Sequence, residues 1–204
     1  MQCNDKGKAE DGGKFVVKGQ LNQPHTLLLQ TLAQLRARYA MRPSKVSDYI
    51  NEAIKQNPIM EETGFTLPGE SDCFYCCACH RDIESPAGDC GRLHTTRKQR
   101  KTNKPVAHYG VIASGNQVVK DAAVCDRLRD AFHALCVEME AAGLMNDFPC
   151  IVIRGICDYA DSHKNDSWQK YAALVAAAYA KEFLGYISPQ RTRLEKPFQN
   201  IAGK

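Results

Sequence analysis

Two short apolar runs that each end in acidic residues constrain the fold of this chain more than any other feature. The first run, ALCVEM at 134–139, carries Glu138 and is followed by Glu140. The second, CIVIRGIC at 150–157, is followed by Asp158. Apolar runs of this length are typical of buried strands. Ligands of open α/β sheets bind in the crevice outside the carboxyl ends of the strands, so the sequence predicts that these acids face one pocket.

Strands and helices alternate along much of the sequence. Residues 1–13 are expected to form a loop, Ser44 is expected to cap the second helix, and Asp166 or Ser167 the last one. The order predicts a three-layer α/β/α fold with a mixed or parallel sheet covered on both faces. The expected strands are 14–18, 106–114, 134–139 and 150–157, and the expected helices are 24–39, 44–57, 126–134, 140–147 and 167–186.

Composition excludes several classes of protein. The chain has 204 residues, a hydrophobic share of 44% and a charged share of 25%, which are ordinary values for a globular protein. A net charge of +4 is too small to indicate nucleic-acid binding by itself. No apolar run reaches the roughly 20 residues that span a bilayer, and the polar N-terminus lacks the apolar core of a signal peptide. We therefore expect an intracellular, cytoplasmic protein without membrane association.

The acids have structural as well as functional interpretations. Alternation along a strand would point Glu138 and Glu140 to the same side. Glu140 would instead favour a helix N-terminus if a helix begins there. Asp158, before Tyr159-Ala160-Asp161, is also a typical turn or cap residue. The residues alone leave both interpretations open.

Three segments together resemble the nucleoside phosphorylase and nucleosidase superfamily. CVEMEAAG at 136–143 is similar to the family's ribose segment, V-E-M-E. IRGICDYAD at 153–161 looks like its strand ending in S/C-D-x-A-D, and HYGVIASGNQVVKD at 108–121 resembles its G-x-x-x-S-G-D-x-F segment. The segments occur in the family's order, and the match is closest to a fungal branch often fused to ankyrin-repeat or NACHT-type modules. The family includes purine and uridine phosphorylases and methylthioadenosine/S-adenosylhomocysteine nucleosidases.

The resemblance implies cleavage of a purine nucleoside N-glycosidic bond, with no cofactor. Asp158 would be the general acid that protonates a ring nitrogen of the base. Glu140 would accept hydrogen bonds from the ribose hydroxyls beside Met139, and Glu138 would orient neighbouring groups. The remaining substrate-binding candidates are Ser114, Gly115, Val118 and Val119, the last two at the base pocket.

The sequence departs from the family pattern at several positions. Val118 stands where an aromatic residue is common, and Asn116 where nucleosidases carry Asp. The family's early acidic residue and Gly-rich phosphate or sugar loop are not visible, so we expect the C-terminal part of such a domain, without its first strands. We assign residues 1–186 to this domain, with a Cys-rich basic insertion at about 60–105, and 187–204 to a polar tail or linker.

The insertion supports a competing hypothesis. Its weak metal candidates have zinc-like local spacing, although they match no well-defined zinc finger: Cys73, Cys76, Cys79 and His80. The basic run that follows is more typical of a solvated surface than of nucleic-acid binding. A zinc-binding loop and a non-catalytic nucleoside-sensing module remain as alternatives. The expected partners are a purine nucleoside or nucleotide and a second copy of the chain, with phosphate left open and nucleic acid not expected.

Overall fold

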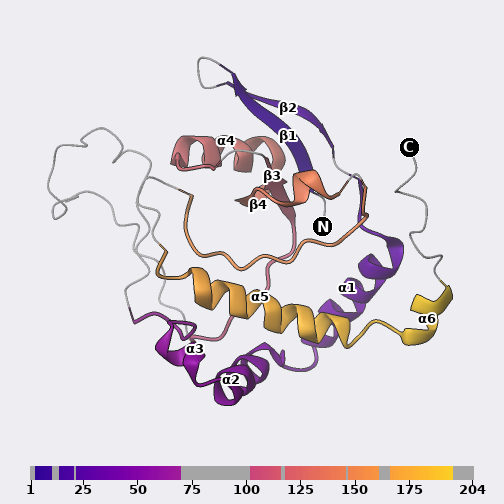
Figure 1. Ribbon diagram of the computed structural model, residues 1–204. Coiled ribbons are helices and arrows are strands. Elements are labelled where there is room, and N and C mark those ends of the chain that lie inside the picture. Colours follow the sequence, from indigo (N-terminus) through magenta and orange to yellow (C-terminus); the bar gives the residue numbers. More distant parts are fainter. Residues whose placement is uncertain are drawn as a thin grey trace, which may run out of the picture.

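A computed structural model describes residues 3–10, 14–20, 22–69, 102–115, 118–145, 147–160 and 166–194. Helices and strands alternate in it as an α/β protein, in agreement with the predicted fold class (Figure 1). The elements are β1 (Cys3–Glu10), β2 (Lys14–Gln20), α1 (Thr26–Tyr39), α2 (Val46–Gln56), α3 (Ile59–Glu62), β3 (Val111–Ser114), α4 (Ala122–Phe132), β4 (Ala134–Glu138), the 3-10 helix η2 (Ala141–Gly143), α5 (Gln169–Leu184) and α6 (Pro189–Leu194).

The described strands form one mixed sheet with the order β2-β1-β3-β4. β1 and β2 pair as an antiparallel hairpin, whereas β1 with β3 and β3 with β4 run parallel. The expected loop over 1–13 is therefore wrong, because β1 occupies most of it and gains its pairing from two neighbours. Local composition did not reveal this strand, since a polar, Gly-containing segment acquires its pairing from tertiary context.

Each face of β3 and β4 packs against a different layer. Ala113 and Val137 lie on the face covered by α4, in a cluster with Leu128. Ile112 and Cys136, one residue earlier in each strand, lie on the opposite face. The parallel register, in which Ser114 stands opposite Glu138, brings the carboxyl ends of the two strands together (Figure 1).

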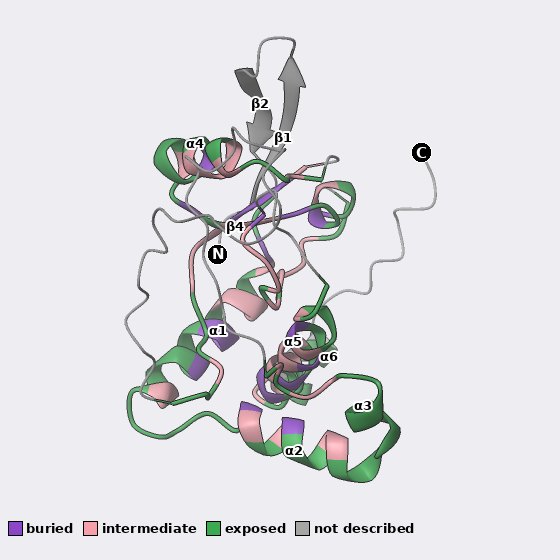
Figure 2. Ribbon diagram, turned by 90° about the vertical axis from the view of Figure 1, so that its left-hand side faces the viewer, coloured by how far each residue is buried: buried purple, intermediate pink, exposed green. Residues whose placement is uncertain are grey.

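Residues 150–157 do not form the strand that the sequence predicts. Within the described chain they carry no strand pairing, although their side chains alternate as in a strand. Cys150 and Val152 pack toward the sheet, whereas Ile151 and Ile153 pack against α1 and α5. The segment thus lies between the sheet and the helices (Figures 1 and 2). Toward the end of the segment the apolar side chain of Ile156 is 53% exposed.

Gly155 crosses α5 in direct backbone contact. A Cβ atom at this position would overlap the carbonyl group of Ala172, so only glycine permits the observed approach. The segment that carries Arg154 and Asp158 is therefore fixed against the helix between these two residues. This contact explains why a glycine interrupts an otherwise apolar and β-branched run.

Glu182 is a buried carboxylate that joins α5 to the turn between α1 and α2. It is 3% exposed, and its Oε2 accepts hydrogen bonds from the Tyr39 hydroxyl at 3.0 Å, the Ser44 hydroxyl at 2.9 Å and the Lys45 N–H at 3.0 Å. Burial, with a smaller contribution from Glu182, raises the pKa of Tyr39. The Ser44 hydroxyl also accepts the Val46 N–H at 3.1 Å, but the N-cap residue of α2 is Lys45, one residue later than the predicted Ser44.

Several other helices and strands differ from the prediction in their length or in their first and last residues. Of the expected strand 106–114 only Val111–Ser114 pairs, and α4 begins at Ala122 rather than at 126. The expected helix 140–147 is reduced to the three residues of η2. Neither Asp166 nor Ser167 caps α5, which begins after Trp168 without a side-chain cap. The short helix α6 lies within the segment 187–204, and no helix among the described residues has the length and apolarity to cross a membrane.

Gly155→Ala tests the close crossing of α5. We expect the added methyl group to push the segment away from Ala172 and to lower the free energy of unfolding by about 1–3 kcal/mol, as overpacking commonly does. Denaturant unfolding measures this loss. Gly143→Ala is the matched control, because a Cβ atom there meets nothing within 4 Å. Equal stabilities of the two variants would contradict the contact.

Glu182→Ala tests the buried carboxylate. Removing it leaves buried donors without their acceptor, which we expect to cost about 2–4 kcal/mol of stability in denaturant unfolding. Glu52→Ala removes a carboxylate that pairs with Lys181 at 3.2 Å on the surface, where an ion pair contributes about 0–1 kcal/mol. A smaller loss for Glu182→Ala than for Glu52→Ala would show that Glu182 does not anchor the turn.

Candidate functional site

A cleft of about 370 Å³ opens beside the carboxyl end of β4. One wall comes from the end of β4 and from η2, and the other from residues 150–154 of the extended segment. Its lining residues are Glu138, Glu140, Ala141, Leu144, Cys150, Ile151, Val152, Ile153 and Arg154.

Glu138 holds the turn that follows β4. Its carboxylate is 5% exposed and accepts the N–H groups of Glu140 at 2.9 Å and Ala141 at 3.0 Å. Glu140 occupies the N-cap position of η2, as one of the two interpretations expected, but its side chain makes no capping hydrogen bond, and the Ala141 N–H donates to Glu138 instead. The strand ends at Glu138 and the chain turns, so simple alternation no longer relates the two acids, although both line the cleft.

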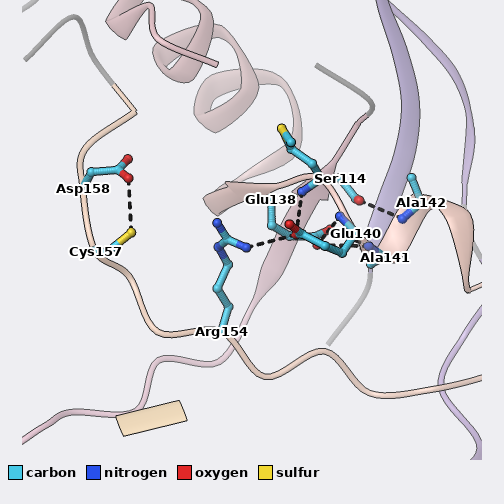
Figure 3. Close-up of polar contacts among 9 residues, drawn as sticks. Ser114, Glu138, Glu140, Ala141, Ala142, Arg154, Cys157 and Asp158 are labelled. Carbon is cyan, nitrogen blue, oxygen red and sulfur yellow. Dashed lines mark hydrogen bonds and ion pairs between the residues drawn. The ribbon is translucent and has the colours of Figure 1, made fainter. Parts of the chain in front are cut away.

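Ser114 and Gly115 support the same turn from β3. The Ser114 hydroxyl oxygen is buried and accepts the Ala142 N–H at 2.8 Å, and the Gly115 N–H donates to the Glu138 carbonyl at 3.1 Å. The ends of the two strands and η2 therefore form one hydrogen-bonded unit (Figure 3). Both residues were predicted from the sequence to bind substrate. In the structure they form hydrogen bonds with the backbone on either side of Glu140.

Glu140 is the exposed acid of the site. Its side chain is 67% exposed, and its Oε2 accepts the Met139 N–H at 3.0 Å and pairs with Arg154 Nη1 at 3.2 Å (Figure 3). The Met139 N–H, with a smaller contribution from the Arg154 guanidinium, lowers the pKa of Glu140. The carboxylate is therefore ionised at neutral pH, an acceptor for hydroxyl groups at the mouth of the cleft.

Arg154 is a residue of the candidate site that the sequence analysis missed. It lies four residues before Asp158, and a charged residue within an apolar run was the signal that could have identified it. Arginine is favoured at such positions because its planar fork keeps several donors available after one is paired. Figure 3 shows its guanidinium between Glu140 and the segment that leads to Asp158.

Asp158 is half-buried and held in a tight turn. Its Oδ1 accepts the Ala160 N–H at 2.8 Å and its Oδ2 accepts the Cys157 thiol at 3.2 Å. Ala160 has a left-handed φ of 54°, and its carbonyl accepts the Cys125 thiol of α4 at 3.6 Å. The turn interpretation of Asp158 is confirmed by this geometry, which is compatible with a second role for the same carboxylate.

The structure brings some predicted residues together and leaves others apart. Glu138 and Glu140 line the cleft, whereas Asp158 lies beyond Arg154 and is not among the lining residues (Figure 3). Met139 is part of the turn and is exposed. Val118, 53% exposed, and Val119 follow two residues that lie outside the described chain, so the expected base pocket is not formed by described contacts.

The candidate metal ligands Cys73, Cys76, Cys79 and His80 lie outside the described residues. In the described part of the chain no group of three or more His, Cys, Asp or Glu side chains is arranged to hold a metal ion. Cys136 of β4 packs against a buried cluster that includes Ile112 and Met145, and burial raises the pKa of its thiol. Such a thiol stays protonated at neutral pH and is a poor metal ligand or nucleophile.

Comparisons with known proteins place the chain in a family. Residues 46–187 match the model of the phosphorylase superfamily, and the chain belongs to this superfamily of nucleoside phosphorylases and nucleosidases. It is 45% identical over 199 residues to a nucleotide-binding leucine-rich repeat (NLR)-like protein of Hyaloscypha variabilis. It is 35% identical over 85 residues to the ATP nucleosidase Cap17 of Escherichia coli.

These relatives are much longer proteins. The first match covers 92% of this chain but 18% of the relative, and the second covers 39% of this chain and 17% of the relative. The chain thus spans less than a fifth of the length of each relative. No solved structure gives a significant match.

Arg154→Gln tests the ion pair at the cleft. We expect the pKa of Glu140 to rise toward that of an ordinary glutamate, because the charge that favours its ionised form is removed. Carboxyl-carbon NMR titration measures the change. Arg129→Gln, which removes an exposed pair with Asp130 on α4, is the control and leaves the Glu140 titration unchanged. An unaltered Glu140 titration in Arg154→Gln would refute the pairing.

Proposed function

We propose that this domain cleaves the N-glycosidic bond of a purine nucleoside or nucleotide. The observation that carries the proposal is the ionised Glu140 at the mouth of a cleft, paired with Arg154 on the same extended segment as Asp158. The arrangement offers an acceptor for sugar hydroxyls and a carboxyl group beyond it. This is the set of groups that glycosyl cleavage needs when the base is the leaving group.

Glu140 and Met139 would hold the ribose. The Glu140 carboxylate accepts hydrogen bonds from vicinal hydroxyls, while Arg154 fixes its orientation and adds donors of its own. Negative charge beside the sugar also stabilises the oxocarbenium-like transition state of glycosyl transfer. Glu138 and Ser114 contribute indirectly, since they hold the turn that presents Glu140.

Asp158 would be the general acid. Proton donation to a ring nitrogen turns the departing purine into a neutral leaving group, an effect of roughly 10²–10⁴-fold for a positioned acid. The Asp158 carboxyl group projects from the extended segment on the same side as the Arg154 guanidinium (Figure 3). A nucleoside with its ribose at Glu140 would extend its base past Arg154 toward Asp158.

The relatives support the class of substrate. The protein of Escherichia coli is named an ATP nucleosidase, which favours nucleosides and nucleotides as ligands for this chain as well. The fungal relative is named as an NLR-like protein, so a role as the effector or sensor part of a longer protein is consistent with the proposed chemistry. The expected intracellular location fits such substrates. Water and phosphate both remain as acceptors of the sugar.

The test is release of free base from adenosine, inosine, methylthioadenosine and ATP, with and without phosphate. We expect Asp158→Asn to lower kcat by about 10²–10⁴-fold, because an amide cannot donate the acid's proton. Glu140→Gln should raise KM and lower kcat, because the ionised acceptor of the ribose hydroxyls is lost. Dependence on phosphate would identify a phosphorylase, and turnover without phosphate a nucleosidase.

The matched control is Asp130→Asn, which replaces an exposed carboxylate of α4 and should leave turnover unchanged. Equal rates for Asp158→Asn and the wild type would remove Asp158 from the mechanism. Nucleoside binding without any base release would replace the proposed enzyme with a nucleoside-sensing module.

A further inference from the structure

The turn between α1 and α2 carries a group of cations around an exposed apolar side chain. Arg38 at the end of α1, and Arg42 and Lys45 in the turn, flank Met41 in the sequence. Met41 is 79% exposed, the highest value among the large apolar side chains of the described residues. Residues 12–47 contain no Asp or Glu. We call the three cations and Met41 the basic face.

The cations of the basic face have no carboxylate partner at the surface. Within the described residues, none of Arg38, Arg42 and Lys45 forms an ion pair. The Arg38 guanidinium lies 5.4 Å from the centre of the Tyr186 ring, and an arginine stacked in this way keeps its N–H donors for a further partner. Glu182 contacts the turn from α5, but it is 3% exposed and accepts the Lys45 N–H. An acidic partner for the cations must therefore come from outside the turn.

The short helix α3, beyond the other end of α2, carries the opposite charge. Glu61 and Glu62 are both exposed, and Ile59 beside them is 60% exposed. Neither carboxylate forms an ion pair among the residues that the structure describes. Lys170 reaches this helix from α5, but it donates to the Thr63 carbonyl at 2.8 Å. We call Ile59, Glu61 and Glu62 the acidic tip.

We propose that the basic face of one copy of this chain binds the acidic tip of a second copy. Each surface has one highly exposed apolar side chain beside charges of one sign, and the two signs are opposite. The surfaces cannot meet within one molecule, because they lie at opposite ends of α2, whose 11 residues span roughly 16 Å (Figure 2). A contact between two different surfaces is head-to-tail, so further copies add until a ring closes or a filament grows.

A second copy suits the basic face better than nucleic acid does. Met41 would be buried against Ile59 of the other copy, whereas a phosphate backbone offers it no apolar contact. The Tyr186 ring is engaged by Arg38, which leaves it less available for stacking with bases. The contact is small, and several linked copies would strengthen it through multivalency. The inference is independent of the proposed function, because neither surface includes a residue of the cleft.

Sedimentation velocity of the full chain over a range of protein concentrations tests the contact. We expect the wild type to form assemblies larger than two copies, and about 0.5 M salt to dissociate them because it screens surface charges. The face variant, Arg42→Gln with Lys45→Gln, and the tip variant, Glu61→Gln with Glu62→Gln, should each self-associate about tenfold more weakly, the effect of losing two exposed ion pairs.

The matched control for the face variant is Lys120→Gln with Arg127→Gln. These two cations are exposed and lie at and before α4, outside both surfaces. The control changes the net charge of the chain by the same amount and should associate as the wild type does. Weakening of association in the control equal to that in the face variant would overturn the inference, because net charge would then explain both results.

Mixing the face variant with the tip variant tests the head-to-tail geometry. The face variant keeps its acidic tip and the tip variant keeps its basic face, so we expect a one-to-one complex that does not grow further. The inference is overturned if the wild type is monomeric at every concentration, if either double variant assembles as the wild type does, or if the mixture forms no complex. A monomeric wild type that binds a DNA duplex through the basic face would assign this face to nucleic acid instead.

Discussion

The backbone contact between Gly155 and Ala172 determines where the candidate site can lie. It fixes the extended segment 150–158 on α5, and a cleft is lined by residues 150–154 of this segment and by the end of β4. Arg154 and Asp158 stand on either side of the contact point. Helix packing rather than sheet pairing therefore sets the position of both charged groups, an unusual solution for a segment with the side-chain alternation of a strand.

Three carboxylates near the ends of these segments have three different environments. Glu138 is buried and saturated by backbone N–H groups, which suits a structural anchor. Glu140 is exposed and ionised beside a guanidinium. Asp158 is half-buried, and its carboxylate accepts hydrogen bonds from the Ala160 N–H and the Cys157 thiol. Environment, more than residue type, assigns the acids different chemistry.

The sequence predicted the class of fold better than the contacts of the candidate site. Periodicity identified α1, α2 and β4, because each buries a contiguous apolar face that is visible in the pattern. The pairing of strands is not visible in the hydrophobic pattern of the sequence. For this reason β1 was missed, and residues 150–157 were expected to form a strand. Both errors concern partners supplied by distant parts of the chain.

In the candidate site, too, contacts between distant parts of the chain could not be predicted from the local sequence. Resemblance to the family pointed to Glu140 and Asp158, but the hydrogen bonds of Glu138 to the backbone of the following turn depend on β4 ending one residue earlier than expected. Arg154 was overlooked because its meaning comes from a carboxylate on another element. No local spacing rule relates the two residues.

The alternation of residues 150–153 has a consequence for how this region can change. Its odd and even positions face different layers, and Gly155 must meet α5 at the same time. Deleting or inserting a single residue would exchange the two sets of side chains and carry the glycine away from its crossing point. The segment can therefore tolerate substitutions by side chains of similar size. A change in its length would disrupt its packing on both layers and the cleft that it lines.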